Sequence, residues 1–238
     1  MIKNHNKLNA VTFLSVVLSI VLASVSAFAE GRVTYPPVEG QPVKAGEGFL
    51  GVCPSYFVGV KVDAGHYSDF GSGCFIAPDT ILSCAHNIRD YHEDGKGKLS
   101  IISHDGRVYT DLKVYTYQKS LDVSVIKINN YDGNGTHSVL DVAHSLVPGD
   151  TVYSVGWNPG TSQVQRHKGL VNNWFYTNQG PKVLDKTWQS HTARVVQGMS
   201  GGPLLDVNGD ICGVNVFSEQ DGSGSGSVSL YWLRRTVR

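Results

Sequence analysis

The chain lacks both a net charge and any run of basic residues. Lysines and arginines number 20, acids also number 20, and charged residues make up only 17% of the 238. Proteins that bind nucleic acids or anionic membranes do so through clusters of lysine and arginine. The one close basic pair, Arg234-Arg235, is interpreted as a solvated tail feature. The sequence therefore predicts no nucleic-acid partner.

Cysteine is scarce, and the four cysteines (Cys53, Cys74, Cys84 and Cys212) form no metal-binding motif. They include no Cys-x-x-Cys pair, and none has histidines at zinc-finger spacing. Cys84 stands two residues before His86, which leaves a metal role open for Cys84, but we expect no metal and no other cofactor. Four cysteines in an exported protein permit three full disulfide pairings, and the sequence does not choose among these and free thiols.

Only one long apolar run occurs, and it lies at the N-terminus. Residues 1–29 begin with two lysines, continue with an apolar stretch over residues 10–23, and end on Ala27-Phe28-Ala29. Signal peptidase cleaves after this small-x-small pattern. A membrane anchor is the alternative, since residues 11–29 are nearly long enough to span a bilayer. We predict a cleaved signal peptide, export to the periplasm or the extracellular space, and no stable membrane association afterwards.

Helical periodicity is missing from the rest of the chain. Residues 30–48 hold three prolines and four glycines, which predicts an irregular arm or a short pro-segment. Beyond them, short runs rich in β-branched and aromatic residues alternate with turn residues, as is typical of all-β barrels or sandwiches. Two sets of about six strands predict two modules, residues 49–145 and residues 146–238. The stretch 221–227, which alternates glycine and serine after Asp221, is predicted to be a flexible loop.

A serine flanked by glycines stands in residues 198–203, which read Gly-Met-Ser-Gly-Gly-Pro. This also fits the Gly-x-Ser-x-Gly elbow of α/β-hydrolases, in which an acid and then a histidine follow the serine. The last histidine of the chain is His191, before Ser200, and the strand and helix alternation of that fold is missing. The elbow interpretation is therefore excluded.

The opposite order, histidine then aspartate then serine, is present. His86 follows two apolar runs in a turn of small residues, and Asp122 heads the apolar run 123–128. These three segments resemble the chymotrypsin/trypsin-like serine protease family, nearer its compact bacterial secreted branch than the animal digestive enzymes. The resemblance covers about residues 56–217. It implies two antiparallel six-stranded β-barrels with the active site in the cleft between them.

The resemblance also implies the role of each residue. Ser200 would be the nucleophile, His86 the general base, and Asp122 the carboxylate that orients the histidine. The backbone N–H groups of Gly198 and Ser200 would form the oxyanion hole. The chain is thus predicted to be a secreted serine endopeptidase that forms an acyl-enzyme, takes protein or peptide substrates, and is monomeric.

Several positions depart from the family pattern. Met199 stands where many members carry the aspartate that pairs with a freed N-terminal amine, so activation is expected not to need a buried N-terminus. Asn87 replaces the cysteine beside the catalytic histidine, and the usual bridge across the histidine loop is therefore missing. Residues 216–218, Val216-Phe217-Ser218, replace the usual Ser-Trp-Gly that pairs with substrate backbone. The serine hydroxyl that often supports the triad aspartate is missing too.

Side-chain specificity is left open by the sequence. Arg194 stands six positions before the nucleophile, at the expected pocket base, where an arginine would select acidic side chains. His191-Thr192 is similar to glutamate-specific bacterial members, yet Asn215 stands where those enzymes usually carry a histidine. An exposed arginine outside the pocket is the alternative.

Two other functions compete with the endopeptidase. A catalytically silent family member would act as a binding or toxin module, but it would be expected to have lost one of the three triad residues. A stress-type quality-control protease would carry peptide-binding domains, for which the segment after Ser200 leaves no room in this sequence.

Overall fold

A computed structural model describes residues 53–133, 138–140, 146–172, 176–177, 180–183, 188–218 and 224–229. The predicted signal peptide and the predicted arm lie outside these residues, so both stay predictions. Among the described residues, no helix has the length and apolar character needed to cross a membrane.

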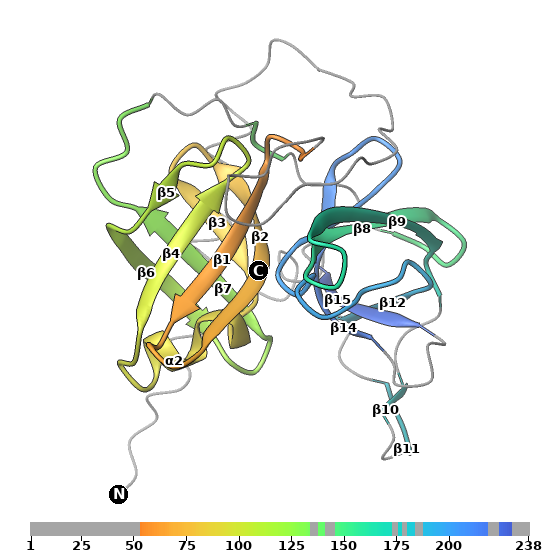
Figure 1. Cartoon of the computed structure of the whole chain (residues 1–238). Helices are drawn as coiled ribbons and strands as arrows, with labels where there is room; N and C mark the ends of the chain where they lie inside the picture. Colours follow the sequence, from red (N-terminus) through yellow and green to blue (C-terminus); the bar gives the residue numbers. More distant parts are fainter. Residues whose placement is uncertain are drawn as a thin grey trace, which may run out of the picture.

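The first unit is a curled antiparallel sheet of seven strands (Figure 1). Its strand order is β5-β4-β1-β2-β3-β7-β6. The strands are β1 (Phe57–Asp63), β2 (Ser68–Ala77), β3 (Thr80–Ser83), β4 (Lys98–Ser103), β5 (Val108–Tyr109), β6 (Leu112–Gln118) and β7 (Val123–Ile128). About six strands are predicted for this unit, and the structure has seven. Between β3 and β4 lie a 3-10 turn, η1 (His86–Ile88), and the short helix α2 (Arg89–His92).

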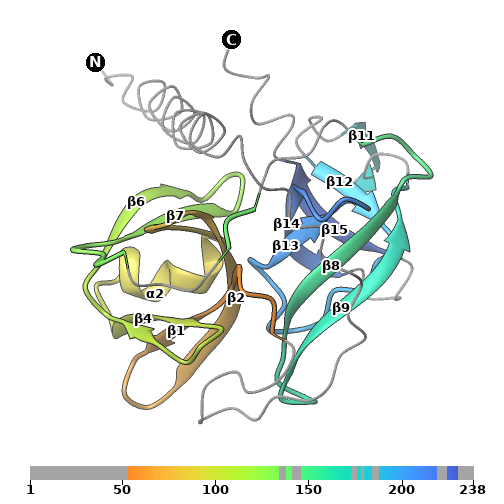
Figure 2. The same ribbon diagram turned by 90° about the horizontal axis from the view of Figure 1, so that it is seen from above.

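The second unit is a six-stranded antiparallel sheet that lies beside the first (Figure 2). Its order is β12-β15-β14-β13-β8-β9, and a separate pair is formed by β10 and β11. The strands are β8 (Thr151–Asn158), β9 (Gln163–Leu170), β10 (Tyr176–Thr177), β11 (Gly180–Val183), β12 (Trp188–His191), β13 (Pro203–Leu205), β14 (Ile211–Ser218) and β15 (Ser225–Ser229). The prediction of an all-β fold with two antiparallel barrel-like units is confirmed.

The loop predicted over residues 221–227 is wrong in its last three residues. These were expected to be flexible, but β15 begins at Ser225 and its residues are buried, whereas residues 221–223 lie outside the described residues. The serine hydroxyls have partners inside the sheet: Ser225 Oγ accepts the Val195 N–H at 3.0 Å, and Ser227 Oγ lies 3.1 Å from Asn215 Oδ1. A run of small polar residues can therefore form an interior strand when each hydroxyl replaces the hydrogen bonds that it loses to water.

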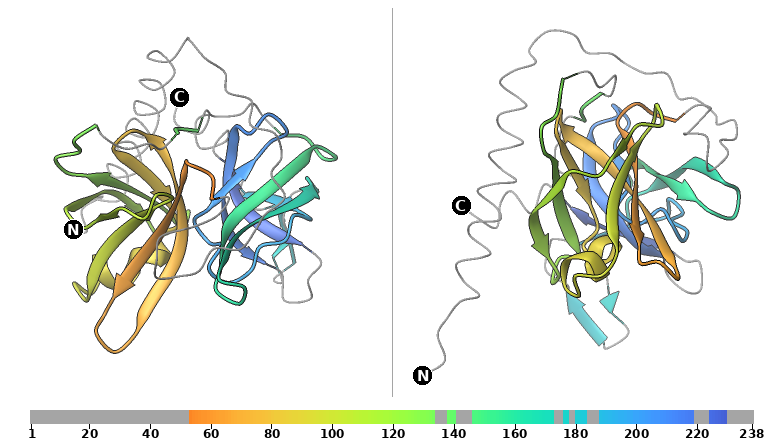
Figure 3. Two further views of the ribbon diagram at one scale, coloured as in Figure 1. Left: turned by 45° about the horizontal axis from the view of Figure 1, so that its top comes forward. Right: turned by 60° about the vertical axis from the view of Figure 1, so that its left-hand side comes forward.

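The two units lie side by side (Figure 3), and an apolar core is shared where they meet. One continuous cluster joins buried side chains of the first sheet, such as Phe57 and Leu82, to buried side chains of the second, such as Val155 and Val214. Separate clusters fill the interior of each sheet. Because burial of apolar surface is non-directional, this contact holds the units together without specifying their relative position to a fraction of an ångström. Polar contacts at the same boundary are needed for that.

A buried histidine ties three strands of the second unit together. His191 on β12 has no exposed surface; its Nδ1 lies 3.0 Å from the Ala193 carbonyl, and its Nε2 lies 2.8 Å from Ser227 Oγ. The same hydroxyl reaches Asn215 on β14, whose amide donates to the carbonyls of Val155 and Pro203. Burial lowers the pKa of His191 to about 4, so the imidazole is neutral near pH 7.

This histidine should make stability pH-dependent. An unfolded His191 binds a proton below about pH 6.5, whereas the folded one does so only near pH 4, so stability falls as the pH drops from about 6.5 to 4. The loss attributable to His191 is on the order of 3 kcal/mol. Urea unfolding of the wild type and of His191→Gln across this range measures it. We expect a shallower pH dependence for the variant; equal slopes would contradict the assignment.

Candidate active site

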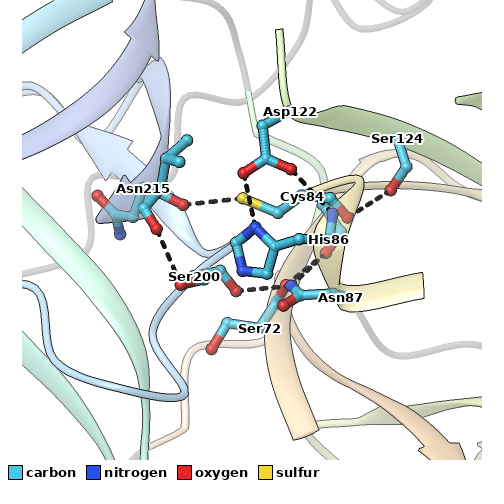
Figure 4. A network of polar contacts seen from close by, with 10 residues as sticks. Ser72, Cys84, His86, Asn87, Asp122, Ser124, Ser200 and Asn215 are labelled. Atoms are coloured by element: carbon cyan, nitrogen blue, oxygen red, sulfur yellow. Dashed lines mark hydrogen bonds and ion pairs between the residues drawn. The ribbon is translucent and has the colours of Figure 1, made fainter. Parts of the chain in front are cut away.

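The histidine and the aspartate are both held by the first sheet. Strand β3 ends at Ser83, and the small buried residues Cys84 and Ala85 lead the chain into η1, where His86 is partly exposed. Asp122 immediately precedes β7 and has a φ of +52°, a left-handed conformation that aspartate tolerates better than most residues. This turn points the carboxylate back toward the start of η1, as Figure 4 shows.

Asp122 holds His86 by two hydrogen bonds. Its Oδ1 accepts the His86 backbone N–H at 2.8 Å, and its Oδ2 lies 2.6 Å from His86 Nδ1. Burial of Asp122 disfavours its charged form, but the bonds from the His86 ring and backbone outweigh burial and hold the pKa of this carboxyl below its usual value. A carboxylate on Nδ1 requires a proton there, which leaves Nε2 as the basic nitrogen on the side of Ser200 (Figure 4).

A thiol lies against this pair. The potential metal-ligating atoms of Cys84, His86 and Asp122 all lie within 4.8 Å of one another, and Cys84 Sγ donates to the Asn215 carbonyl at 3.1 Å. Burial raises the pKa of the Cys84 thiol, and the Asp122 carboxylate raises it further, so the thiol keeps its proton. Among the described residues these three side chains form the group that could hold a metal, and two of them, His86 and Asp122, belong to the predicted triad. All four cysteines are free thiols in the structure, which answers the pairing question that the sequence left open.

The serine comes from the second unit. Ser200 lies in the loop before β13, and its hydroxyl donates to the Val216 carbonyl at 3.0 Å rather than to His86, in the part of the chain that the structure describes. Val216 lies where the register of β14 against β15 shifts, so its carbonyl is turned toward the serine. The hydroxyl must leave the Val216 carbonyl before it can donate to His86 Nε2. Catalytic hydrogen bonds are often incomplete in unliganded sites.

Two glycines are required by the shape of the serine loop. Gly198 and Gly201 both have a φ of +88°, which side chains rarely adopt. A Cβ on Gly198 would lie 2.8 Å from the Trp157 carbonyl oxygen, and one on Gly201 would lie 2.1 Å from the Ser72 carbonyl oxygen. The backbone of the first sheet thus approaches the serine loop too closely for any side chain at residue 201.

Ser72 on β2 links the two units at this loop. Its hydroxyl accepts the Trp157 N–H at 2.8 Å and donates to the Gly198 carbonyl at 2.7 Å, and its N–H donates to the Ser200 carbonyl at 2.8 Å. The Met199 carbonyl accepts the Gly202 N–H at 3.1 Å. With these carbonyls held, the N–H groups of Gly198 and Ser200 donate to no described residue, as donors to a substrate oxygen must.

Met199 is fully buried in the second unit. A Cβ added to Gly156 on β8 would lie 2.6 Å from the Met199 Cα and Cβ, so the two backbones are in close contact. The thioether sulfur lies 3.5 Å from the Val196 backbone nitrogen. The side chain before the nucleophile is therefore fixed by packing.

The residues predicted for the substrate pocket lie in two different environments. His191 and Asn215 are buried and bonded within the second unit, as described above. Arg194 and Thr192 are exposed; the Arg194 carbonyl accepts bonds from Ser154 Oγ and His167 Nδ1, and Thr192 Oγ1 accepts the Leu170 N–H. Of the strand residues, Val216 is buried with its carbonyl at Ser200, whereas Phe217 and Ser218 are exposed at the end of β14.

Three contacts of the site had no signal in the sequence. Nothing in the sequence distinguishes Ser72. Asn87 stands out only as a replacement for a cysteine, and Cys84 only as a potential metal ligand or disulfide partner. Each meets the second unit across more than 100 positions of the chain. The Gly-Ser-Gly of residues 71–73 could have suggested a close backbone approach, but not its partner.

Comparison with known proteins gives one family match. A family model described as a trypsin-like peptidase domain matches residues 71–214, more than half of the chain. The chain is 28% identical over 179 residues to the Arabidopsis thaliana protein named protease Do-like 14, and 29% identical over 153 residues to serine protease HTRA1 of Xenopus laevis. These matches cover 73% and 61% of this chain. The chain spans only 40% and 30% of the length of the two relatives.

Solved structures agree with the fold. The active form of the Rv3671c protease from M. tuberculosis superposes with a TM-score of 0.59 at 22% identity, covering 74% of this chain and 76% of that one. The serine endoprotease from Yersinia pestis gives 0.60 at 19% identity, covering 77% of this chain and 64% of that one. At such identities the likeness concerns the fold.

The two bonds from Asp122 to His86 generate a prediction for Asp122→Asn. An amide places a donor on one of its two positions, so it cannot accept from both the His86 N–H and Nδ1–H, and the ring takes the wrong tautomer. We expect kcat for a peptide substrate to fall by about 10⁴, with little change in thermal stability. A fall of less than about tenfold would contradict this role of the carboxylate.

Proposed function

Because the chain belongs to the family of trypsin-like peptidase domains, we propose that it is an exported serine endopeptidase that uses His86, Asp122 and Ser200. The observation that carries the proposal is the doubly bonded His86–Asp122 pair, with His86 Nε2 facing Ser200 across the boundary of the two units. Protein or peptide chains are the proposed substrates, and the enzyme is proposed to be a monomer.

The proposed reaction proceeds in two halves. Ser200 Oγ attacks the substrate carbonyl carbon while its proton passes to His86 Nε2, and the N–H groups of Gly198 and Ser200 bind the resulting oxyanion. The C–N bond then breaks, the leaving amine takes the proton from His86, and an ester on Ser200 remains. Water attacks this ester while His86 takes one of its protons, the bond between Ser200 Oγ and the acyl carbon then breaks, and His86 returns the proton to Oγ as the acid product leaves.

Substrate backbone is proposed to pair with the exposed end of β14, residues 216–218, next to the nucleophile. Arg194 is exposed, so selection of acidic side chains by this arginine would have to occur at the surface of the site. Incubation with a peptide library, followed by sequencing of the cleavage products, measures the preference directly.

Export is supported by the N-terminal pattern of residues 1–29 and by relatives of periplasmic type, such as the DegP-like serine endoprotease of Chlamydia trachomatis. Cleavage after Ala29 is part of the proposal. Mass spectrometry of the exported protein tests it.

A fluorophosphonate probe tests the proposed nucleophile. We expect the probe to label wild-type protein at Ser200, because His86 and the oxyanion donors activate that hydroxyl. Ser200→Ala should remove the label without loss of folding, and His86→Ala should slow labelling by at least about 10³. Folded wild-type protein that is not labelled would instead favour a silent binding module.

The burial of Met199 leads to a prediction about activation. An apolar residue at this position cannot form an ion pair with an N-terminal amine, so the start of the chain should not control the serine loop. Proteins that begin at Glu30 and at Gly46 are expected to cleave a peptide with the same kcat/KM. The prediction is contradicted if only one of the two proteins is active and that activity is lost when its N-terminal amine is acetylated.

A further inference from the structure

The side-chain amide of Asn87, the neighbour of His86, reaches toward the backbone of Ser200 in the second unit (Figure 4). Its amide nitrogen Nδ2 donates to the Ser200 carbonyl at 2.8 Å and to Ser83 Oγ at 3.0 Å, and it lies 3.4 Å from the Ser72 carbonyl. The residue that directly follows the base thus bonds to the backbone of the nucleophile, 113 positions away in the chain.

The orientation of this amide follows from its partners. Two of them are carbonyl oxygens, which only accept. The third, Ser83 Oγ, donates its proton to the Ser72 carbonyl at 2.7 Å and therefore accepts from Asn87. Only the NH₂ end of the amide can satisfy all three. Asn87 therefore acts as a donor at this point, and a carboxylate of the same shape could not replace it.

The bond from Asn87 completes the fixation of one peptide unit. The Ser200 carbonyl accepts from both Asn87 Nδ2 and the Ser72 N–H, while the Gly201 N–H on the other side of the same peptide donates to the Asn215 carbonyl at 2.7 Å. The plane of the Ser200–Gly201 peptide is thereby set by donors from the first unit and an acceptor from the second. A shift of η1 relative to the serine loop would lengthen the bond from Asn87 Nδ2 to the Ser200 carbonyl.

We propose that Asn87 is a positioning residue, which fixes the nucleophile backbone relative to His86 by holding the Ser200 carbonyl. The inference rests on the proposed function and names a determinant of that same site. In place of a covalent bridge beside the histidine, this chain uses an amide that spans the boundary between the units.

Gly71 supplies the geometry for a sharp test. A Cβ added there would lie 2.4 Å from Cγ of Asn87, which is one bond of about 1.5 Å from the Asn87 Cβ. The two Cβ atoms would then be at most about 4 Å apart, and the upper end of that range meets the Cβ separation of a disulfide. A Gly71→Cys/Asn87→Cys protein can thus anchor the histidine loop covalently without a donor to Ser200.

The first experiment compares Asn87→Asp and Asn87→Ala with Ser83→Ala as the matched control. Ser83→Ala removes one partner of the amide but leaves its bond to the Ser200 carbonyl. We expect both Asn87 variants to lose kcat by about tenfold to a hundredfold, because small displacements of reacting groups have such effects. The KM of both Asn87 variants, and the kcat and KM of Ser83→Ala, should be close to the wild-type values. Wild-type kcat in folded Asn87→Asp would overturn the proposal.

The second experiment uses the double-cysteine protein in its oxidised and reduced forms. The oxidised form should regain the thermal stability lost in Asn87→Ala, whereas kcat should stay low because no donor reaches the Ser200 carbonyl. Recovery of wild-type kcat on oxidation would overturn the proposal and assign Asn87 to loop anchoring alone. Labelling of the wild type by the fluorophosphonate is measured first, so a failure of the proposed function is recognised separately.

Discussion

The distance between His86, the proposed base, and Ser200, the proposed nucleophile, depends on hydrogen bonds across the boundary of two sheets. His86 and Asp122 belong to the first unit and Ser200 to the second, so neither sheet alone contains a complete site. The apolar cluster between the units holds them together, but its contacts are tolerant of small shifts. The directional bonds from Ser72 and Asn87 to the serine loop remove that tolerance.

The same bonds explain how the serine loop keeps its shape next to a buried methionine. Met199 packs against Gly156 and makes no charge contact, so the backbone carbonyls must be held by neutral donors. Ser72 holds Gly198, and Ser72 with Asn87 holds Ser200. Neutral hydrogen bonds in a buried setting are insensitive to pH near neutrality, and they need no change at the N-terminus to form.

A buried thiol lies near the Asp122 carboxylate. Cys84 lies against the carboxylate and keeps its proton, and its thiol also reaches the Asn215 carbonyl. Asn215 belongs to the buried network around His191, so the acid of the predicted triad is connected to the interior of the second unit. The buried hydrogen bonds around His191 in the second unit are thus connected, through Asn215, to the hydrogen bonds at the candidate active site.

The sequence by itself determined the all-β class, the two units and the three residues of the predicted triad, because alternating apolar runs and an ordered histidine, aspartate and serine are properties of residue type and spacing. It also identified the replacements Met199 and Asn87. Only the tertiary structure decided what Ser72, Cys84 and Asn87 contact, that residues 225–229 form an interior strand, and that the Ser200 hydroxyl rests on Val216. The contacts of Ser72, Cys84 and Asn87 join positions more than 100 residues apart. The burial of residues 225–229 and the partner of the Ser200 hydroxyl depend on how the strands of the second unit pair, and local patterns contain neither kind of information.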